Sequence, residues 1–272
     1  NAGKPGRAIP LSHNTYCTGM YSTIFRDNIF TRAASIHNKF TANQGSGSCR
    51  EVIIDNNLYV DGEIGISMGG NRSGPLRWVD CRIINNVMLD IGLSRPTGRH
   101  LAWYIGATDW DGGLIANNLL IHQRSPDVTN VRGLMLASSG PDRGEEPRVH
   151  TRNLTVRDNI LHGLASRGYA LIAHFRSMQG VRMMDNQIQM PGLATGMVHF
   201  SGDDAEGVKI SGNTYWSDAP RDTWFRHDRE PMGLRGWAEF SGEASDTVKK
   251  VDYRDPERNI QAYMKQIGME PT

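Results

Sequence analysis

The sequence predicts an all-β protein: a right-handed parallel β-helix (solenoid) of about seven coils, followed by a C-terminal extension that ends in a short helix. Three observations lead to this prediction. Short apolar segments with a central asparagine recur along the chain, a second strand-like segment follows most of them, and no helical period of 3.6 residues lies between the two. A chain that repeats such a unit is typical of a solenoid, in which successive windings stack on one another.

The asparagine-containing segments carry the repeat. They read FRDNIF, IIDNNLYV, RIINNVML, LIANNLLI, TVRDNILH, MMDNQIQM and KISGNTYW, and their aligned asparagines are Asn28, Asn57, Asn86, Asn118, Asn159, Asn186 and Asn213. The spacings are 29, 29, 32, 41, 27 and 27 residues. Parallel windings lie about 4.8 Å apart, so equivalent amides can hydrogen-bond along the axis while they tolerate a left-handed backbone angle. We therefore expect an asparagine ladder at one corner, with a structural role.

Two other repeat folds fit the pattern less well. A leucine-rich repeat would show a Leu-x-x-Leu-x-Leu motif at a shorter period of about 20 to 29 residues, and that motif is missing. A β-propeller needs four antiparallel strands in each blade, whereas each repeat here has room for two or three short strands. The parallel β-helix is therefore the favoured architecture.

The second strand of each winding predicts an outward surface. These strands read ASIHNKF, EIGISMGG, LAWYIGA, RGLMLASS, YALIAHF and TGMVHFSG. Alternation places Ile36, Asn38 and Phe40 on one face of the first strand, and His37 and Lys39 on the other. The residues of the next strand expected to point inward are Ile64, Ile66 and Met68. The residues expected to face outward beside His37 and Lys39 are Ser67, Gly69, Tyr104, His174 and Arg176.

Three insertions flank these strands. They cover residues 93–100, residues 122–132 and the loop SSGPDRGEEPRVHTRN. Long loops carried by a rigid scaffold often hold binding or catalytic residues. We expect them to wall a groove over the outward surface.

Composition excludes several classes of function. Thirty basic and twenty-nine acidic side chains leave a formal charge of +1, so no overall field attracts nucleic acid. No run of about 18 apolar residues is present to span a membrane. The three cysteines, Cys17, Cys49 and Cys81, form no CxxC pair, and at least one thiol is unpaired within the chain.

The pattern changes after Asn213, so we expect residues 1–216 to form the β-helix and residues 217–272 a capping segment. Within that segment a helix is expected near 255–268, with Asp255 as N-cap and Gly268 as its end. A solenoid must cover its open end, because unpaired strand edges bind other chains. The N-terminal end shows no comparable cover. We expect preceding coils or a second chain to cover it.

The segment SIHNKFTANQ, followed by GEIGISMGGN, resembles the right-handed parallel β-helix proteins of the pectate lyase-like superfamily, nearest to polysaccharide lyases such as alginate lyases and chondroitinase B. The resemblance covers residues of about 24–216. In that family a lysine in an Asn-Lys-Ser-like motif acts as base, and an arginine in the next coil supports it. The resemblance implies Lys39 as the base. Ser67 and Met68 stand where the arginine and its neighbour are expected, and Arg72 follows as the substitute.

Elimination next to a uronate carboxylate fits the available side chains. It needs a base for the C5 proton, a cation for the carboxylate and a proton donor for the leaving oxygen. We expect Lys39 beside His37 as the base, Tyr104 or His174 as the donor, and Arg72 or Arg176 at the carboxylate. The expected substrate-binding residues are Arg176, Glu63, Asp61, Trp103 and His199. The predicted function is a secreted, periplasmic or cell-surface lyase that cleaves an anionic polysaccharide.

A glycoside hydrolase is an alternative on the same fold. Its two carboxyl groups would lie about 5 to 10 Å apart across the sugar bond, and the available pairs are Asp61 with Glu63, Asp109 with Asp111, and Asp203 with Asp204. The segment TDWDGG offers two acids to a calcium ion, which is too few to assign a metal site. Calcium is therefore an open option, and we expect no other cofactor.

A non-catalytic surface or glycan-binding solenoid is the second alternative. Aromatic rings stack on sugars whether or not the sugar is then cleaved. The candidate rings are Tyr59, Trp78, Trp103, Trp110, Tyr215 and Trp216. Cleavage predicts convergent bases beside such rings, whereas binding alone predicts an aromatic strip without them.

Overall fold

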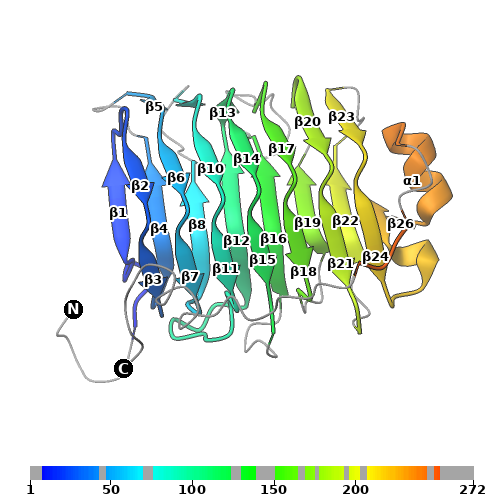
Figure 1. Cartoon of the computed structure of the whole chain (residues 1–272), viewed down its shortest axis with the longest axis horizontal. Helices are drawn as coiled ribbons and strands as arrows, with labels where there is room; N and C mark the ends of the chain where they lie inside the picture. Colours follow the sequence, from blue (N-terminus) through cyan, green and yellow to red (C-terminus); the bar gives the residue numbers. More distant parts are fainter. Residues whose placement is uncertain are drawn as a thin grey trace.

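The computed structural model describes residues 8–42, 47–69, 76–123, 130–138, 151–164, 169–174, 178–192, 196–202, 207–243 and 248–251, with the backbone alone at 172–174. In these ranges short strands follow one another around a common axis and stack into a parallel β-solenoid, as Figure 1 shows. The predicted fold class is therefore confirmed.

One sheet, here named the long sheet, contains nine strands. Its strands in spatial order are β1 (Thr15–Thr18), β4 (Ile36–Thr41), β8 (Ile64–Met68), β12 (Leu101–Thr108), β16 (Asn130–Ala137), β19 (Tyr169–His174), β22 (Gly196–Ser201), β25 (Phe225–His227) and β26 (Glu230–Met232). Every neighbouring pair is parallel except β25 and β26, which are antiparallel.

Two further sheets of seven strands each complete the windings. The β2 sheet contains β2 (Ile24–Arg26), β6 (Ile53–Asp55), β10 (Arg82–Ile84), β14 (Leu114–Ala116), β17 (Thr155–Arg157), β20 (Val181–Met184) and β23 (Val208–Ser211). The β3 sheet contains β3 (Ile29–Thr31), β7 (Leu58–Val60), β11 (Val87–Leu89), β15 (Leu119–Ile121), β18 (Ile160–His162), β21 (Gln187–Met190) and β24 (Thr214–Ser217). A small sheet holds β5 (Cys49–Arg50), β9 (Trp78–Val79) and β13 (Trp110–Asp111). The number of turns differs slightly from the predicted seven coils.

The predicted asparagine ladder lies at the corner between the β2 and β3 sheets. The Asn57 side-chain amide donates to Oδ1 of Asn86 at 2.9 Å, and the Asn57 main-chain N–H donates to the same oxygen at 3.0 Å. The same two bonds recur at every step from Asn28 to Asn213, at 2.9 to 3.1 Å. Each amide oxygen thus satisfies two buried donors of the winding before it.

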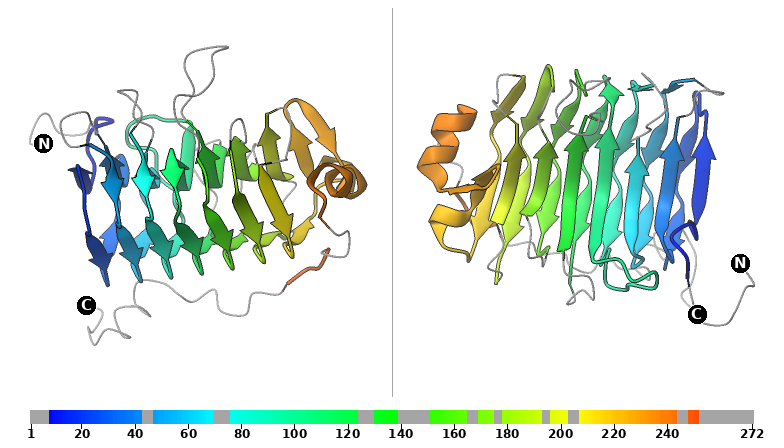
Figure 2. Two further views of the ribbon diagram at one scale, coloured as in Figure 1. Left: turned by 90° about the horizontal axis from the view of Figure 1, so that it is seen from above. Right: turned by 180° about the vertical axis from the view of Figure 1, so that it is seen from behind.

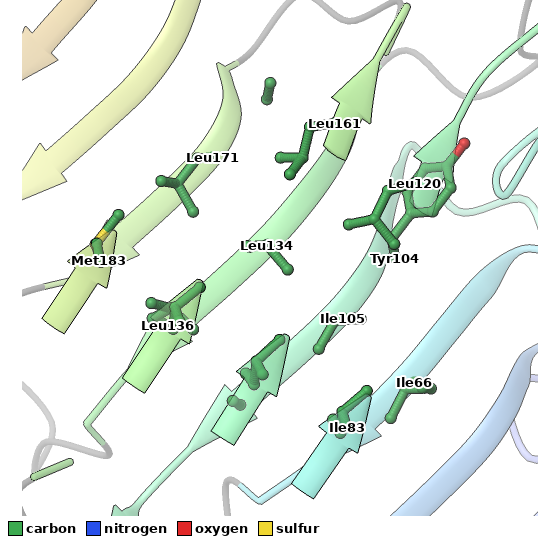
Figure 3. Packing of buried hydrophobic residues seen from close by; sticks show 14 of the residues in the cluster. Ile66, Ile83, Tyr104, Ile105, Leu120, Leu134, Leu136, Leu161, Leu171 and Met183 are labelled. Atoms are coloured by element: carbon green, nitrogen blue, oxygen red, sulfur yellow. The ribbon is translucent and has the colours of Figure 1, made fainter. Parts of the chain in front are cut away.

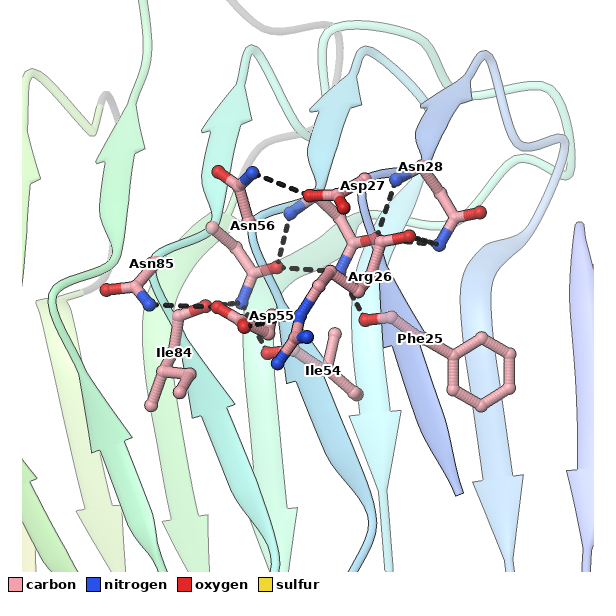
Figure 4. A network of polar contacts seen from close by, with 11 residues as sticks. Phe25, Arg26, Asp27, Asn28, Ile54, Asp55, Asn56, Ile84 and Asn85 are labelled. Atoms are coloured by element: carbon pink, nitrogen blue, oxygen red, sulfur yellow. Dashed lines mark hydrogen bonds and ion pairs between the residues drawn. The ribbon is translucent and has the colours of Figure 1, made fainter. Parts of the chain in front are cut away.

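The residue directly before each ladder asparagine is Asp, Asn or Gly, and it takes the left-handed backbone conformation. These residues are Asp27, Asn56, Asn85, Asn117, Asp158, Asp185 and Gly212, with φ between 52° and 68°. The expectation that the ladder asparagines themselves adopt this angle is therefore wrong. Asp, Asn and Gly are the residues that tolerate it best. Figure 4 shows the resulting outer contacts, such as the Asn56 amide that donates to Asp27 at 2.7 Å.

The interior of the solenoid is filled by one continuous apolar cluster, part of which Figure 3 shows. Ile66 and Met68 of β8 belong to it, as alternation predicts, and Asn38 and Phe40 of β4 are also fully buried. Lys39, between the last two, is partly exposed and lies beside Ser67 of the next winding. The alternation of faces is therefore confirmed for the C-terminal halves of these strands.

Alternation fails in the middle of the long sheet. Tyr104 and Ile105 are consecutive, yet both are completely buried, and the paired residues skip from Trp103–Arg132 to Ile105–Leu134. The paired residues keep the same offset of 29 on both sides of this position, so neither strand contains an extra residue. Two consecutive inward residues mark a bend that neighbouring strands share, and the bend reverses the faces of the residues before it. Gly65 occupies the equivalent place on β8, where a Cβ would lie 2.2 Å from the Tyr104 carbonyl oxygen.

Two predicted outward residues are therefore inside. The Tyr104 hydroxyl donates to the Ile121 carbonyl at 2.7 Å, and Figure 3 shows its ring beside Leu120 in the interior. The His37 ring, also fully buried, packs edge-on against Tyr59 with centroids 5.5 Å apart. The prediction that His37 and Tyr104 face a ligand is wrong, because the shared bend turns this row of the sheet inward.

The C-terminal end of the solenoid is covered. A 3-10 helix (Arg221–Thr223) leads into β25, and helix α1 (Leu234–Ser241) follows β26 across the end, as Figure 2 shows. Trp237 of α1 stacks on Phe225 with ring centroids 4.7 Å apart. Glu243 receives the last ladder bonds, from Asn213 at 2.9 and 3.0 Å.

Part of the predicted capping segment, β25 and β26, thus belongs to the long sheet. The helix expected near 255–268 lies outside the described residues. Within the described ranges, the model has no helix with the length and apolar character needed to span a bilayer.

We predict that Asn118→Ala lowers the free energy of unfolding by about 2–4 kcal/mol, because it leaves the buried Asn86 main-chain N–H without its acceptor and also removes one bond of the Asn86 side-chain amide. The neighbouring Asn117 is exposed, with φ 56°. Its replacement by Gly keeps the backbone angle and should change stability by less than about 0.5 kcal/mol. Urea unfolding of both variants tests the ladder, and equal losses would contradict its role.

Candidate functional site

The outward face of the long sheet gathers cationic and aromatic side chains on neighbouring strands. Trp103 of β12 pairs with Arg132 of β16, and Tyr169 of β19 follows in the same row, since Leu134 pairs with Leu171. In the adjacent row His199 of β22 pairs with Arg226 of β25. We name these five residues the outer patch.

The bend and two glycines explain why these side chains lie outside. Trp103 precedes the bend, and its indole lies outward over Gly106 of the same strand, where a Cβ would be 2.9 Å from the indole nitrogen. Tyr169 lies over Gly196 of the next strand, whose Cβ would be 2.2 Å from the ring. Each ring therefore lies over a glycine, where a larger residue would clash with it.

Neither arginine of the outer patch is ion-paired with a carboxylate within the described part of the chain. Arg132 is partly buried; its Nε has no hydrogen-bond partner among the described residues, and burial lowers its pKa. The Arg226 Nε donates to the Asp228 carbonyl at 2.9 Å. A guanidinium group with unused donors is suited to bind a carboxylate.

His199 and Tyr169 lie between the two arginines, with ring centroids 5.5 Å apart. The pKa of His199 is lowered, first by burial and then by Arg226 and Arg132, although its bond to the Asp228 carbonyl opposes the shift. In the neutral ring, the Nε2–H donates to that carbonyl at 2.9 Å, which leaves Nδ1 as the basic atom. Burial raises the pKa of Tyr169, and a hydrogen bond from Arg226 offsets part of the rise.

The outer patch therefore combines the groups that proton abstraction next to a carboxylate requires. Two guanidinium groups can hold the acid, a neutral imidazole can accept a proton, and a protonated phenol can donate one. Trp103 adds an aromatic surface beside Arg132. Of these residues, sequence analysis named Trp103 and His199 and missed Arg132, Tyr169 and Arg226.

Lys39, the expected base, lies far from this group. Its row continues through Ser67, Gly106, Met135 and the β19 strand to His199, which is five strand steps, or roughly 24 Å at about 4.8 Å per step. The Lys39 Nζ donates to the Ser67 hydroxyl at 3.2 Å, and burial lowers its pKa. Lys39 and His199 are therefore too far apart to act on one sugar bond.

The acids expected to bind substrate instead hold a loop. Asp61 accepts bonds from the Ser94 hydroxyl at 2.8 Å and from its N–H at 3.1 Å. The Glu63 carboxyl group is completely buried and pairs with Arg99 at 2.9 Å and with the Thr97 hydroxyl. These contacts hold residues 93–100, the loop expected to border a groove, against β8. Glu63 is not accessible to a ligand in this arrangement.

Other candidates have separate outcomes. Asp109 is buried, and Asp111 pairs with Arg152 at 2.6 Å and with Arg77 at 3.4 Å. The hydrogen bond from Arg152 lowers the pKa of Asp111. The described ranges contain no group of three or more His, Cys, Asp or Glu side chains arranged for a metal ion. The predicted residues Arg72, Arg176, Asp203 and Asp204 lie outside the described residues, as does the side chain of His174.

The candidate aromatic strip is mostly interior. Tyr59, Trp78, Trp110 and Tyr215 are completely buried or nearly so, whereas Trp103 and Trp216 are partly exposed. A sugar could contact only the last two of these rings.

No family model matches the chain, and searches of curated proteins and of solved structures find no match either.

We predict that His37 makes stability depend on pH. Asn14 donates to its Nδ1 at 3.1 Å and its Nε2–H donates to the Asp61 carbonyl, so the neutral ring uses both nitrogens. Burial lowers its pKa from 6.5 to about 4. The contribution of neutral His37 is complete above pH 6.5 and is lost as the pH falls towards 4, by up to about 3 kcal/mol at 1.36 kcal/mol per pKa unit.

The matched variant is His37→Gln, which keeps an N–H donor for Asp61 but does not titrate. Thermal unfolding of both proteins between pH 7.5 and pH 4 measures the difference. The wild type should lose more stability than the variant across this window. Parallel curves would show that His37 does not set the pH dependence.

Proposed function

We propose that the protein binds an anionic polysaccharide over the outer patch and cleaves it by β-elimination next to a uronate. The observation that carries the proposal is a pair of arginines with no carboxylate partner among the described residues, on either side of His199, whose pKa is lowered, and Tyr169, whose pKa is raised. The resemblance of the sequence to β-helix polysaccharide lyases points to the same chemistry. An enzyme for such polymers would act outside the cell or at its surface.

In the proposed reaction Arg132 and Arg226 bind the uronate carboxylate and stabilise the charge that develops on it. His199 Nδ1 takes the C5 proton. The electron pair of that C–H bond forms the C4–C5 double bond as the C4–O bond breaks. Tyr169 gives its proton to the leaving glycosidic oxygen. The products are an unsaturated uronate and a new chain end, and solvent returns the proton from His199 to Tyr169.

Lys39 has a different part in this proposal. It lies on the same outward face but roughly 24 Å away, so it would contact the same polymer several sugar units along the axis. A polymer that follows the axis crosses the stacked strands at about 4.8 Å per winding. Lys39 would then contribute to affinity and His199 to turnover.

The hydrolase alternative has less support than elimination. A hydrolase needs two carboxyl groups that face one bond. Among the described candidates, Glu63 is buried against Arg99, and Asp111 is held by two arginines. Binding without cleavage is the outcome that the experiment below distinguishes.

We predict that the protein releases unsaturated uronate products from at least one of pectate, alginate or chondroitin sulfate, as measured by ultraviolet absorbance. Tyr169→Phe and His199→Gln should each lower kcat by about 10²–10⁴-fold, because each removes a proton-transfer group. Arg132→Gln should lower kcat/KM, and Arg132→Lys should restore part of it. Lys39→Ala should raise KM with little effect on kcat.

The control is Arg82→Gln, an exposed arginine on the β2 sheet, which should leave kinetics unchanged. Binding without unsaturated product would assign the patch to glycan recognition alone. New reducing ends without unsaturation would indicate hydrolysis. Absence of both binding and cleavage across the panel would overturn the proposal.

We also predict that kcat/KM falls at a lower pH than the ordinary pKa of histidine would give. The base form of His199 persists to lower pH than that of a free histidine, because burial and the two arginines lower its pKa below 6.5. The acid limb of the kcat/KM profile should therefore have its midpoint below 6.5. Removing one neighbouring charge by Arg226→Gln should move this midpoint upward, and an unchanged midpoint would argue against His199 as the base.

A further inference from the structure

The N-terminal end of the solenoid contains an incomplete winding. The long sheet extends to β1, whereas β2 and β3 are the terminal strands of their own sheets. Each later winding, from the one with β4 to the one with β25, contributes one parallel strand to the long sheet, one to the β2 sheet and one to the β3 sheet. Among the described residues, the winding that contributes β1 therefore has one of its three strands, and Figures 1 and 2 show β2 and β3 at that end.

The exposed apolar surface gathers at this end. Within the described residues, the large hydrophobic side chains that are exposed are Ile9, Leu11, Tyr16, Tyr21 and Ile24. Ile24 of the edge strand β2 is 55% exposed.

The interior is open at the same place. Phe25 and Phe30 are only partly buried, although the residues that pair with them in the next winding, Ile54 and Tyr59, are completely buried. Among the described residues, none covers the apolar core at this end face as fully as the next winding covers Ile54 and Tyr59.

The asparagine ladder has an unused acceptor on this face. Asn28 donates both bonds to Asn57, but its own Oδ1 accepts none from the described residues. Every later ladder oxygen accepts two bonds from the winding before it. At the opposite end, Glu243 accepts the bonds of Asn213 and closes the ladder. Only the Asn28 end is therefore set to receive another amide.

We propose that a further winding, formed by an extended segment outside residues 1–272, docks on β2 and β3. It pairs in parallel with both strands, covers Phe25 and Phe30, and places an asparagine at its corner whose side-chain amide and main-chain N–H donate to Oδ1 of Asn28. This is the interface that already joins successive windings. Adding a strand to an exposed sheet edge is also a known mode of peptide recognition.

A second copy of the chain fits this face less well. Its C-terminal end is covered by α1 and Glu243, so head-to-tail stacking is blocked. Two N-terminal faces related by a two-fold axis would run antiparallel and would bring two Asn28 acceptors together. A separate winding can pair in parallel with β2 and β3 and can supply donors to Asn28 Oδ1. Both points favour it over a second copy of the chain.

The probe is a synthetic peptide of Arg50–Gly62, which contains β6, β7 and Asn57, the strands that already pair with β2 and β3. Fluorescence anisotropy with the labelled peptide should show saturable binding to the full chain. Hydrogen exchange should slow at Ile24 and Ile29, since the equivalent N–H groups of Ile53 and Leu58 donate to the preceding winding. A peptide with Asn57→Ala should bind at least tenfold more weakly.

The protein variant is Ile24→Lys, which should weaken peptide binding at least tenfold. Its control is Arg82→Lys in the same row of the β2 sheet, two windings inward, which should bind normally. Equal binding of both peptides, or no binding up to about 1 mM, would contradict the proposal. Sedimentation that shows a dimer broken by Ile24→Lys would overturn it in favour of a second copy.

Discussion

The structure depends on a repeated amide hydrogen bond at one corner. Each ladder asparagine from Asn57 to Asn213 accepts two donors from the preceding winding and gives two to the next acceptor, within a corner that is closed to water. Since an unpaired buried donor is costly, the bonds allow one vertical alignment between windings. That alignment fixes the register of all three sheets. Residues 27 to 41 positions apart in sequence thereby become neighbours in straight rows.

Because the windings stack in fixed rows, the bend of the long sheet determines which side chains form its outer surface. Since windings stack in register, an inward shift at Tyr104 is carried to the equivalent positions at Gly65 and Gly133. The residues just before it, Trp103 and Arg132, are turned outward together. The same constraint that builds the core therefore assembles a cationic and aromatic surface from distant parts of the chain.

The fold could be predicted from the sequence because the residues that specify it, the ladder asparagines, recur once per winding. Asparagine at Asn57, Asn86 and Asn118 repeats with the winding, and the ladder follows directly from that spacing. The residues of the outer patch were harder to predict, because they face outward as a result of a local break in the alternation of inward and outward residues. His37 and Tyr104 obey the outward pattern in sequence but lie inward, while Arg132 and Tyr169 stand at strand starts and gave no separate signal.

The ladder also has a direction. All of its amides point the same way, from Asn28 towards Glu243, so their dipoles add along the axis. A hydrogen-bonded chain of this kind polarises its members. Its far end is terminated by a carboxyl group and its near end presents an oxygen. The two ends of the ladder therefore differ in polarity, and within the described residues only the Asn28 end keeps an acceptor that a further winding could use.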